Sequence, residues 1–290
     1  MPAKSDSGQR RHCAGSITMD KTALLAALPV KSDENICLLF EAGAQPEEAF
    51  LAFKASHESR LHSLYIHPQL TELQNYGPWL LEVDDKEQLK AYLETIPGCV
   101  AVIISTRYPP SLAVQLSRGC TIVPPEGTAV LVRFYASHVI QVLANCAAHD
   151  WHVSLFRGIS QWWIPAEAQW QLLSISASCN ENSADHVIRL DNATWQRISD
   201  KPEITSVLKE WQTMPASKGI SPCAQRLLVI KALNKADKVG LEKPVDRMLY
   251  AICYLNGAKK MLESERFSAA LPRILNGQIS LSQVISGISS

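Results

Sequence analysis

Short apolar runs typical of β-strands alternate with amphipathic helical patterns through residues 20–190, and the β pattern ends at Asp191. The most apolar run, Cys99 to Ile104, predicts a central strand of a sheet that is covered on both faces. Beyond Asp191 only helical patterns remain, separated by breaks rich in proline, glycine and serine. The sequence therefore predicts an α/β N-terminal lobe, with a mixed β-sheet flanked by helices, and a smaller all-α C-terminal lobe.

The patterns also place the individual elements. Strands are expected at residues 35–40, 64–66, 78–83, 99–104, 129–135, 158–163, 170–176 and 187–190, the last two as a hairpin. Helices are expected from Pro46 and over residues 86–96, 111–118, 137–148, 192–199, 204–211, 223–239, 244–262 and 281–288. The resulting division is a disordered N-terminal extension over residues 1–18, an α/β domain over 19–199 and a helical lobe over 200–290.

The polar start of the chain has no apolar segment of the kind found in secretion signals, and the longest apolar run is too short for a membrane span. Eight cysteines occur without any C-x-x-C pair, and most of them lie in apolar runs. We expect reduced, buried thiols in a cytoplasmic protein with no membrane partner.

Charge is balanced over the chain but unevenly distributed. The 28 basic and 28 acidic side chains give a formal net charge of zero, which argues against a nucleic-acid partner. Residues 200–290 carry 13 basic and 8 acidic side chains, a net charge of +5, which leaves −5 on residues 1–199. Opposite net charges favour docking of the two lobes.

The sequence contains none of the short catalytic motifs with a known mechanism. Glycine-rich phosphate loops, a G-x-S-x-G turn and an H-E-x-x-H pair are all missing. His149 and His152 have the spacing of zinc ligands one helical turn apart, but they also fit polar residues at a helix end. We expect no metal, no cofactor and no enzymatic activity, the alternative being a hydrolase or transferase with scattered catalytic residues.

Four of the seven tryptophans fall between residues 151 and 170, and two of them, Trp162 and Trp163, are neighbours. Adjacent residues of a strand face opposite sides of the sheet, so both are buried only if both faces are covered. The alternative is an aromatic anchor on a partner-binding surface, where tryptophan is enriched.

Several motifs occur in an order that resembles the effector-chaperone (adaptor) family of bacterial type VI secretion. They are NICLLFEAGAQPEEAFLAF, LHSLYIHPQL, YGPWLLEVD, CVAVIISTRYPPSLAVQLSRG, VPPEGTAVLVRFYASHVIQVL and IRLDNATWQRI, within residues 33–200. Two features depart from the family pattern. Ala136-Ser137 replaces the usual Asp-Pro after Arg-Phe-Tyr, which removes a possible carboxylate partner for Arg133, and the loop before Leu116 lacks the common histidine.

The resemblance implies an adaptor that holds one toxic effector, stabilises it and helps to load it onto the valine–glycine repeat (VgrG) spike. A structural subunit of the assembled machine is the alternative reading. The candidate contact residues are Tyr65, Trp79, Arg133, Phe134, Trp162 and Trp163, each of which could instead lie in the core. Arg133 is the most informative of them, because a charge in an apolar strand must be paired or reach a surface.

Overall fold

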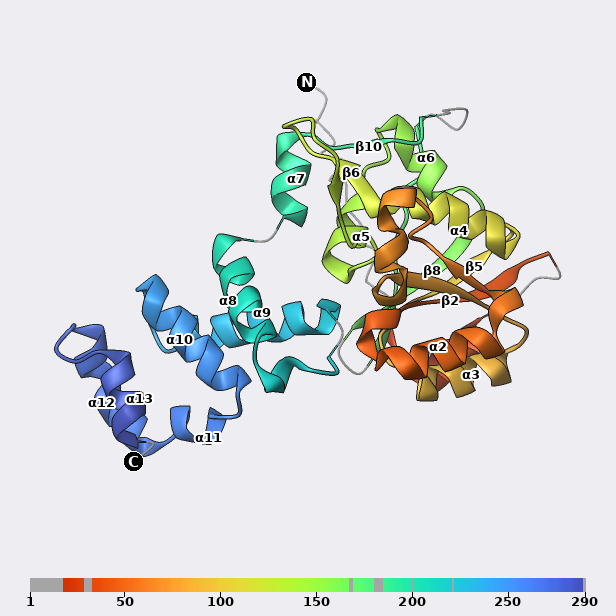
Figure 1. Cartoon of the computed structure of the whole chain (residues 1–290). Helices are drawn as coiled ribbons and strands as arrows, with labels where there is room; N and C mark the ends of the chain where they lie inside the picture. The colour runs from red at the N-terminus through yellow and green to blue at the C-terminus, as the bar shows by residue number, and fades with distance from the viewer. Residues whose placement is uncertain are drawn as a thin grey trace, which may run out of the picture.

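The fold is described from a computed structural model, which covers residues 18–28, 33–166, 169–179, 185–199, 201–220 and 222–288. Figure 1 shows an α/β lobe built by the chain up to α7, and a helical lobe that α8 and α9 connect to it. The α/β class and the helical C-terminal region are thus confirmed. The extension predicted for residues 1–18 lies outside the described residues, except Thr18, which belongs to a strand.

A seven-stranded sheet forms the centre of the α/β lobe. In spatial order its strands are β1 (Thr18–Met19), β9 (Gln169–Leu172), β8 (Ile159–Ala166), β5 (Cys99–Ser105), β2 (Asn35–Glu41), β4 (Pro78–Val83) and β3 (Leu61–Ser63). The apolar run at Cys99–Ile104 therefore occupies a central strand, as its composition predicts.

All neighbours in this sheet are antiparallel, whereas the strand–helix–strand order predicts a mixed sheet. The helix between β4 and β5 does carry the chain into a strand of the same direction. However, β2 lies between these two strands and runs antiparallel to both. The crossover is present, but it joins strands that are not neighbours.

Parallel pairing occurs instead in a second sheet, in the order β10 (Ile188–Arg189), β6 (Thr121–Val123), β7 (Val130–Leu131), where β10 and β6 are parallel. The hairpin predicted between residues 170–176 and 187–190 is therefore wrong, since β9 pairs with β8. The strand predicted over residues 129–135 is also too long. The chain turns after β7, where the Ala136 N–H donates to the Arg133 carbonyl at 3.0 Å.

Helices cover both faces of the large sheet. One face packs against α1 (Lys21–Ala27), α2 (Glu47–Ser56) and α3 (Lys86–Thr95), which contribute Leu24, Phe50 and Leu89 to its core. The other face packs against α4 (Pro109–Ser117), α5 (Ser137–Leu143) and α6 (Asp150–Phe156), which contribute Leu112, Ile140 and Leu155. The helix predicted over residues 137–148 ends earlier, at Leu143, and α6 is a separate helix that the sequence analysis did not predict.

The helical lobe follows α7 (Asn192–Ile198), whose Ile198 still packs on the α/β core. Its helices are α8 (Pro202–Gln212), α9 (Pro222–Lys238), α10 (Pro244–Leu255), α11 (Lys259–Leu262), α12 (Glu265–Leu275) and α13 (Leu281–Ile288). The helix predicted over residues 244–262 is interrupted at Gly257, whose φ of +90° suits glycine and ends α10. The boundary at residue 200 between two domains remains a prediction.

The helical lobe has two apolar cores of its own. Val207, Trp211, Val229, Leu233 and Ala251 form one between α8, α9 and α10, and Tyr250, Phe267, Ile274 and Leu281 contribute to the other. Within the described residues, no helix combines the length and the apolar content that crossing a membrane requires.

Candidate functional site

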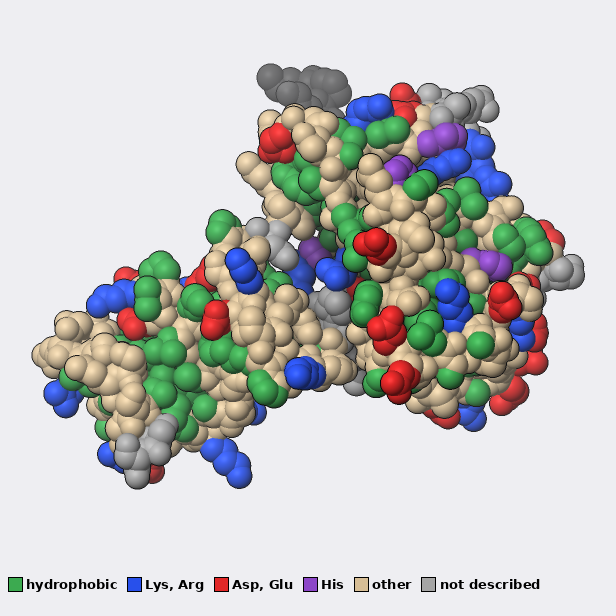
Figure 2. All heavy atoms as spheres, in the orientation of Figure 1, with side chains coloured by type: hydrophobic (Ala, Val, Ile, Leu, Met, Phe, Trp, Pro, Cys, Tyr) green, Lys and Arg blue, Asp and Glu red, His purple; other side chains and the backbone are tan. Residues whose placement is uncertain are grey.

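A cavity of about 350 Å³ opens between the two lobes. Its walls come from the segment after β7, the start of α5, and the helices α7, α8 and α9. Eight of the residues that line it are apolar and six are polar or charged: Leu131, Val132, Arg133, Ala136, Ser137, His138, Val139, Trp195, Ile198, Ser199, Leu208, Gln212, Arg226 and Leu227. Figure 2 shows the hollow between the lobes, with basic and histidine side chains visible in it. We name it the interlobe cleft.

Arg133 is the one predicted contact residue that reaches this cleft. Its side chain is 51% exposed, and its Nε lies 3.1 Å from Oε1 of Glu41 at the end of β2. Glu41 is only 1% exposed, and the hydroxyl of Tyr135 donates to the same oxygen at 3.1 Å. The arginine is therefore both paired and at the surface.

Phe134 and Trp162 lie together in the core of the α4–α6 face, with ring centroids 6.4 Å apart. Phe134 passes so close to Gly119 that a Cβ on this glycine would lie 2.7 Å from the phenyl ring. The close approach explains a glycine at this position and holds the segment after β7 against the sheet.

Trp163 points to the opposite face of the sheet from Trp162, into the core cluster that also contains Trp79 and Phe50, whose ring centroids lie 5.4 Å apart. Both neighbouring tryptophans are buried, as the alternation of a doubly covered strand requires. Tyr65 is buried as well, against Gly77, where a Cβ would lie 2.4 Å from its ring. Trp79 donates through Nε1 to the Gln74 carbonyl at 2.8 Å.

Five of the six candidate residues therefore stabilise the α/β lobe: Tyr65, Trp79, Phe134, Trp162 and Trp163. For the interlobe cleft we retain only Arg133 as a candidate contact. No motif in the sequence singles out the cleft residues Trp195, Arg226 and Leu227, which belong to α7 and α9. What distinguishes them is their position across the gap between the lobes.

The histidine pair of the sequence analysis lies at the start of α6. His149 is the residue before this helix and stacks on Trp151, and its Nε2 lies 3.9 Å from Asp191. His152 is buried, and its ring Nε2 lies 3.0 Å from the Ala144 carbonyl. Among the described residues, no group of three or more histidine, cysteine, aspartate or glutamate side chains could hold a metal ion.

Comparison with known sequences finds a family match within the α/β lobe. Residues 37–153, from β2 into α6, match the family described as Domain of unknown function (DUF4123). This match covers less than half of the chain. This family is the effector-adaptor family of type VI secretion, so the resemblance of the motifs is confirmed.

The DUF4123 match includes Glu41, Arg133 and Tyr135 but not the helices α7, α8 and α9 across the cleft. A relative of the chain is "Accessory protein VasW" of Vibrio cholerae serotype O1, 21% identical over 179 residues. That match covers 61% of this chain and 59% of the relative. The chain therefore spans less than two thirds of the relative's length. No solved structure matches the chain significantly. The chain is thus similar to an accessory protein over part of its length, and residues 37–153 match DUF4123.

Proposed function

We propose that this protein is a cytoplasmic type VI adaptor, which binds a cognate toxic effector, stabilises it and helps to load it onto the VgrG spike. The DUF4123 domain is the observation that carries this proposal. The interlobe cleft supports it, because it combines exposed apolar side chains with polar groups, as protein-binding surfaces do.

In this proposal the effector segment occupies the interlobe cleft. Leu227 of α9 is 55% exposed and lines the cleft from the helical lobe, opposite Leu131 and Arg133 on the α/β lobe. A partner segment between them would bury apolar surface on both lobes, at ~25 cal/mol per Å² of apolar area removed from water. Because the bound effector segment would be removed from solvent, it could not associate with other copies of itself and aggregate.

The test is co-expression of this protein with the effector and spike proteins encoded at the same locus. Deletion of this protein should reduce the soluble amount of the effector, and Leu227→Asp should reduce it as well. Leu275→Asp is the matched control, because Leu275 is 46% exposed in the same lobe but does not line the cleft. If the effector stays equally soluble and is secreted equally well without this protein, the adaptor function is wrong.

Two other outcomes point to the alternatives. Retention of this protein in the purified secreted spike would identify a structural subunit. Turnover of a small molecule would identify an enzyme with scattered catalytic residues.

A further inference from the structure

Strand β3 forms one edge of the large sheet, and its outer side faces a second hollow. β3 pairs with β4 in the register Leu61 with Leu81, His62 with Leu80 and Ser63 with Trp79. The Leu64 N–H donates to the Pro78 carbonyl at 3.0 Å, so the backbone groups of Leu64, and of His62 two residues earlier, face β4. Those of Leu61 and Ser63 face away from the sheet, because they alternate along an antiparallel strand.

These outward groups have no partner in the described part of the chain. No hydrogen bond within it engages the Ser63 N–H, the Ser63 carbonyl or the Leu61 carbonyl. A row of such groups at a sheet edge is a template for another extended backbone.

An open groove of about 410 Å³ lies directly beside this edge. Leu61, His62 and Ser63 line its floor, and its two walls are formed by the end of α2 with the turn that follows it, and by α4. The wall residues are Lys54 and Glu58 on the α2 side, and Pro110, Ala113 and Val114 on the α4 side. Figure 2 shows hydrophobic side chains between α2 and α4, interspersed with acidic, basic and histidine side chains. We name this hollow the β3 groove.

The two walls differ in chemistry. Val114 and Ile66 are large apolar side chains that remain exposed. On the other wall, the ammonium of Lys54 lies 5.0 Å from the centre of the Trp79 ring. Neither Lys54 nor Glu58 forms an ion pair with another described residue. An extended segment alternates its side chains, so it can present apolar groups to α4 and charges complementary to Lys54 and Glu58 to α2.

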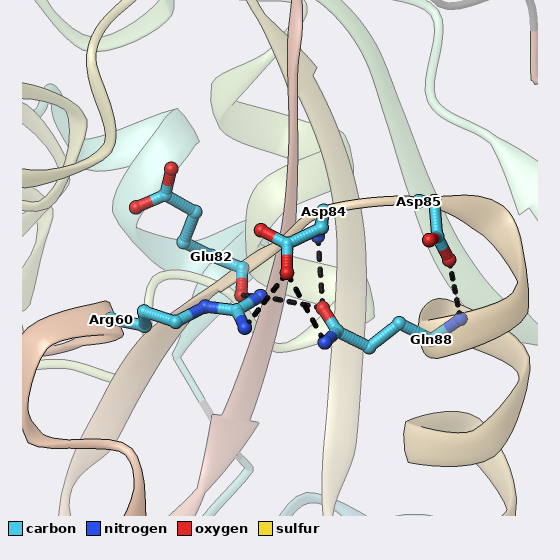
Figure 3. Close-up of polar contacts among 5 residues, drawn as sticks. All are labelled: Arg60, Glu82, Asp84, Asp85 and Gln88. Atoms are coloured by element: carbon cyan, nitrogen blue, oxygen red, sulfur yellow. Dashed lines mark hydrogen bonds and ion pairs between the residues drawn. The ribbon is translucent and has the colours of Figure 1, made fainter.

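The start of β3 is anchored by the side chain of Arg60, the residue before the strand. Figure 3 shows the Arg60 guanidinium directed at the backbone carbonyl of Glu82, while the Glu82 carboxylate points away from it. The same guanidinium pairs with Asp84 at 2.9 Å and donates to Gln88 Oε1 at 2.5 Å. The side chain of Arg60 therefore ties the start of β3 to the connection between β4 and α3.

We propose that the β3 groove binds an extended segment of a partner polypeptide, which adds an eighth strand to the large sheet at β3. The partner segment alternates apolar residues, which face Val114, with charged residues, which face Lys54 and Glu58. This site is separate from the interlobe cleft, so the proposal holds or fails independently of the adaptor function.

The test is a titration of the full-length ¹⁵N-labelled protein with a short acetylated peptide in which valine alternates with glutamate and lysine. We expect the amide signals of Leu61, Ser63 and Val114 to shift and the Ser63 amide to exchange more slowly with solvent. A matched peptide, methylated on the backbone nitrogens of one edge, should bind about tenfold more weakly, since it loses ladder hydrogen bonds.

Protein variants complete the test. Ser63→Pro removes the outward N–H without breaking a bond to β4, and proline is tolerated at sheet edges. Ser63→Ala is the matched control, because both variants lose the bond that the Ser63 hydroxyl accepts from the Tyr65 N–H. We expect Ser63→Ala to bind the peptide and Ser63→Pro to lose binding. If Ser63→Pro does not fold, Val114→Lys in the groove serves instead, with Leu73→Lys outside it as the control.

Three results would overturn the proposal. The first is failure of the unmethylated peptide to bind. The second is equal binding by Ser63→Pro and Ser63→Ala, and the third is equal affinity for the methylated and unmethylated peptides.

Discussion

Arg133 and Glu41 join two distant parts of the chain through a contact of 3.1 Å between Nε and Oε1. Glu41 ends the central strand β2, and Arg133 follows β7 at the wall of the interlobe cleft. A carboxylate that is 1% exposed needs compensating charge or hydrogen bonds, which Arg133 and Tyr135 supply. The pair therefore connects the sheet core to the surface where we place the partner.

Replacement of Arg133 by alanine should destabilise the protein by about 2 kcal/mol, because it removes the cation beside a buried carboxylate. Addition of Glu41→Gln to this variant should recover part of the loss, since a neutral amide is less costly to bury. Urea unfolding of the single and double variants measures both effects. The exposed pair of Arg189 and Asp185 provides the control, and Arg189→Ala should cost less than ~1 kcal/mol. Equal losses for the two arginines would contradict a structural role for the Arg133 pair.

Gly119→Ala should destabilise the α/β lobe, because the added methyl group would lie 2.7 Å from the Phe134 ring. Overpacking of this kind typically costs ~1–3 kcal/mol. Gly287→Ala is the matched control in α13, where nothing lies within 4 Å of the added atom, and it should be neutral or slightly stabilising. Thermal unfolding of the two variants gives the comparison. A Gly119→Ala variant as stable as the wild type would show that Phe134 is free to move away.

The sequence predicts the fold correctly where a short stretch of neighbouring residues determines the bounds of a strand or helix. Strand β4 spans Pro78–Val83, as predicted, because its apolar run is bounded by Pro78 and by two aspartates. The N-terminal cap of α3 was predictable for the same reason, because both partners lie within three residues of each other. Asp85 accepts a hydrogen bond from the Gln88 N–H at 2.8 Å. Pairing between strands was not predictable in the same way. Ile188 pairs with Ile122 rather than with β9, and nothing in either short run specifies that choice.

The candidate site was only partly predictable for the same reason. Arg133 stood out because it is a charge beside apolar residues, but its partner Glu41 lies in a strand far earlier in the chain. Aromatic residues were poor guides, because a sheet covered on both faces buries Trp162 and Trp163 alike. The interlobe cleft depends on how two lobes approach each other, which periodicity does not encode.

Buried cysteines should resist alkylation in the folded protein. Burial, with a smaller contribution from Glu82, raises the pKa of Cys37 to about 12, so this thiol holds no reactive thiolate near pH 8. Cys179 is exposed and should react with iodoacetamide before Cys37, as peptide mass spectrometry would show. The same shift predicts that stability falls as pH rises from 9.0 toward 12, since the unfolded chain releases this proton earlier. Rapid alkylation of Cys37 without denaturant would contradict the burial of β2.

His152 should make the protein sensitive to mild acid. Burial lowers its pKa below the ordinary 6.5, and the nearby His149 lowers it further, against an opposing effect of the Ala144 carbonyl. Because this carbonyl only accepts hydrogen bonds, the neutral ring carries its proton on Nε2, 3.0 Å from the oxygen. As pH falls below 6.5 the unfolded chain takes up a proton that the folded chain resists, so the free energy of unfolding decreases.

His152→Gln should reduce this acid sensitivity, since the glutamine amide can still donate to Ala144 but does not titrate. His152→Phe removes both the titration and the donor, so it should cost about 1 kcal/mol more than His152→Gln at neutral pH. Urea unfolding at neutral and mildly acidic pH separates the two effects. If the wild type and His152→Gln lose stability equally on acidification, His152 does not resist protonation. The acid response must then be assigned to another group. His62 is such a group, because burial also lowers its pKa.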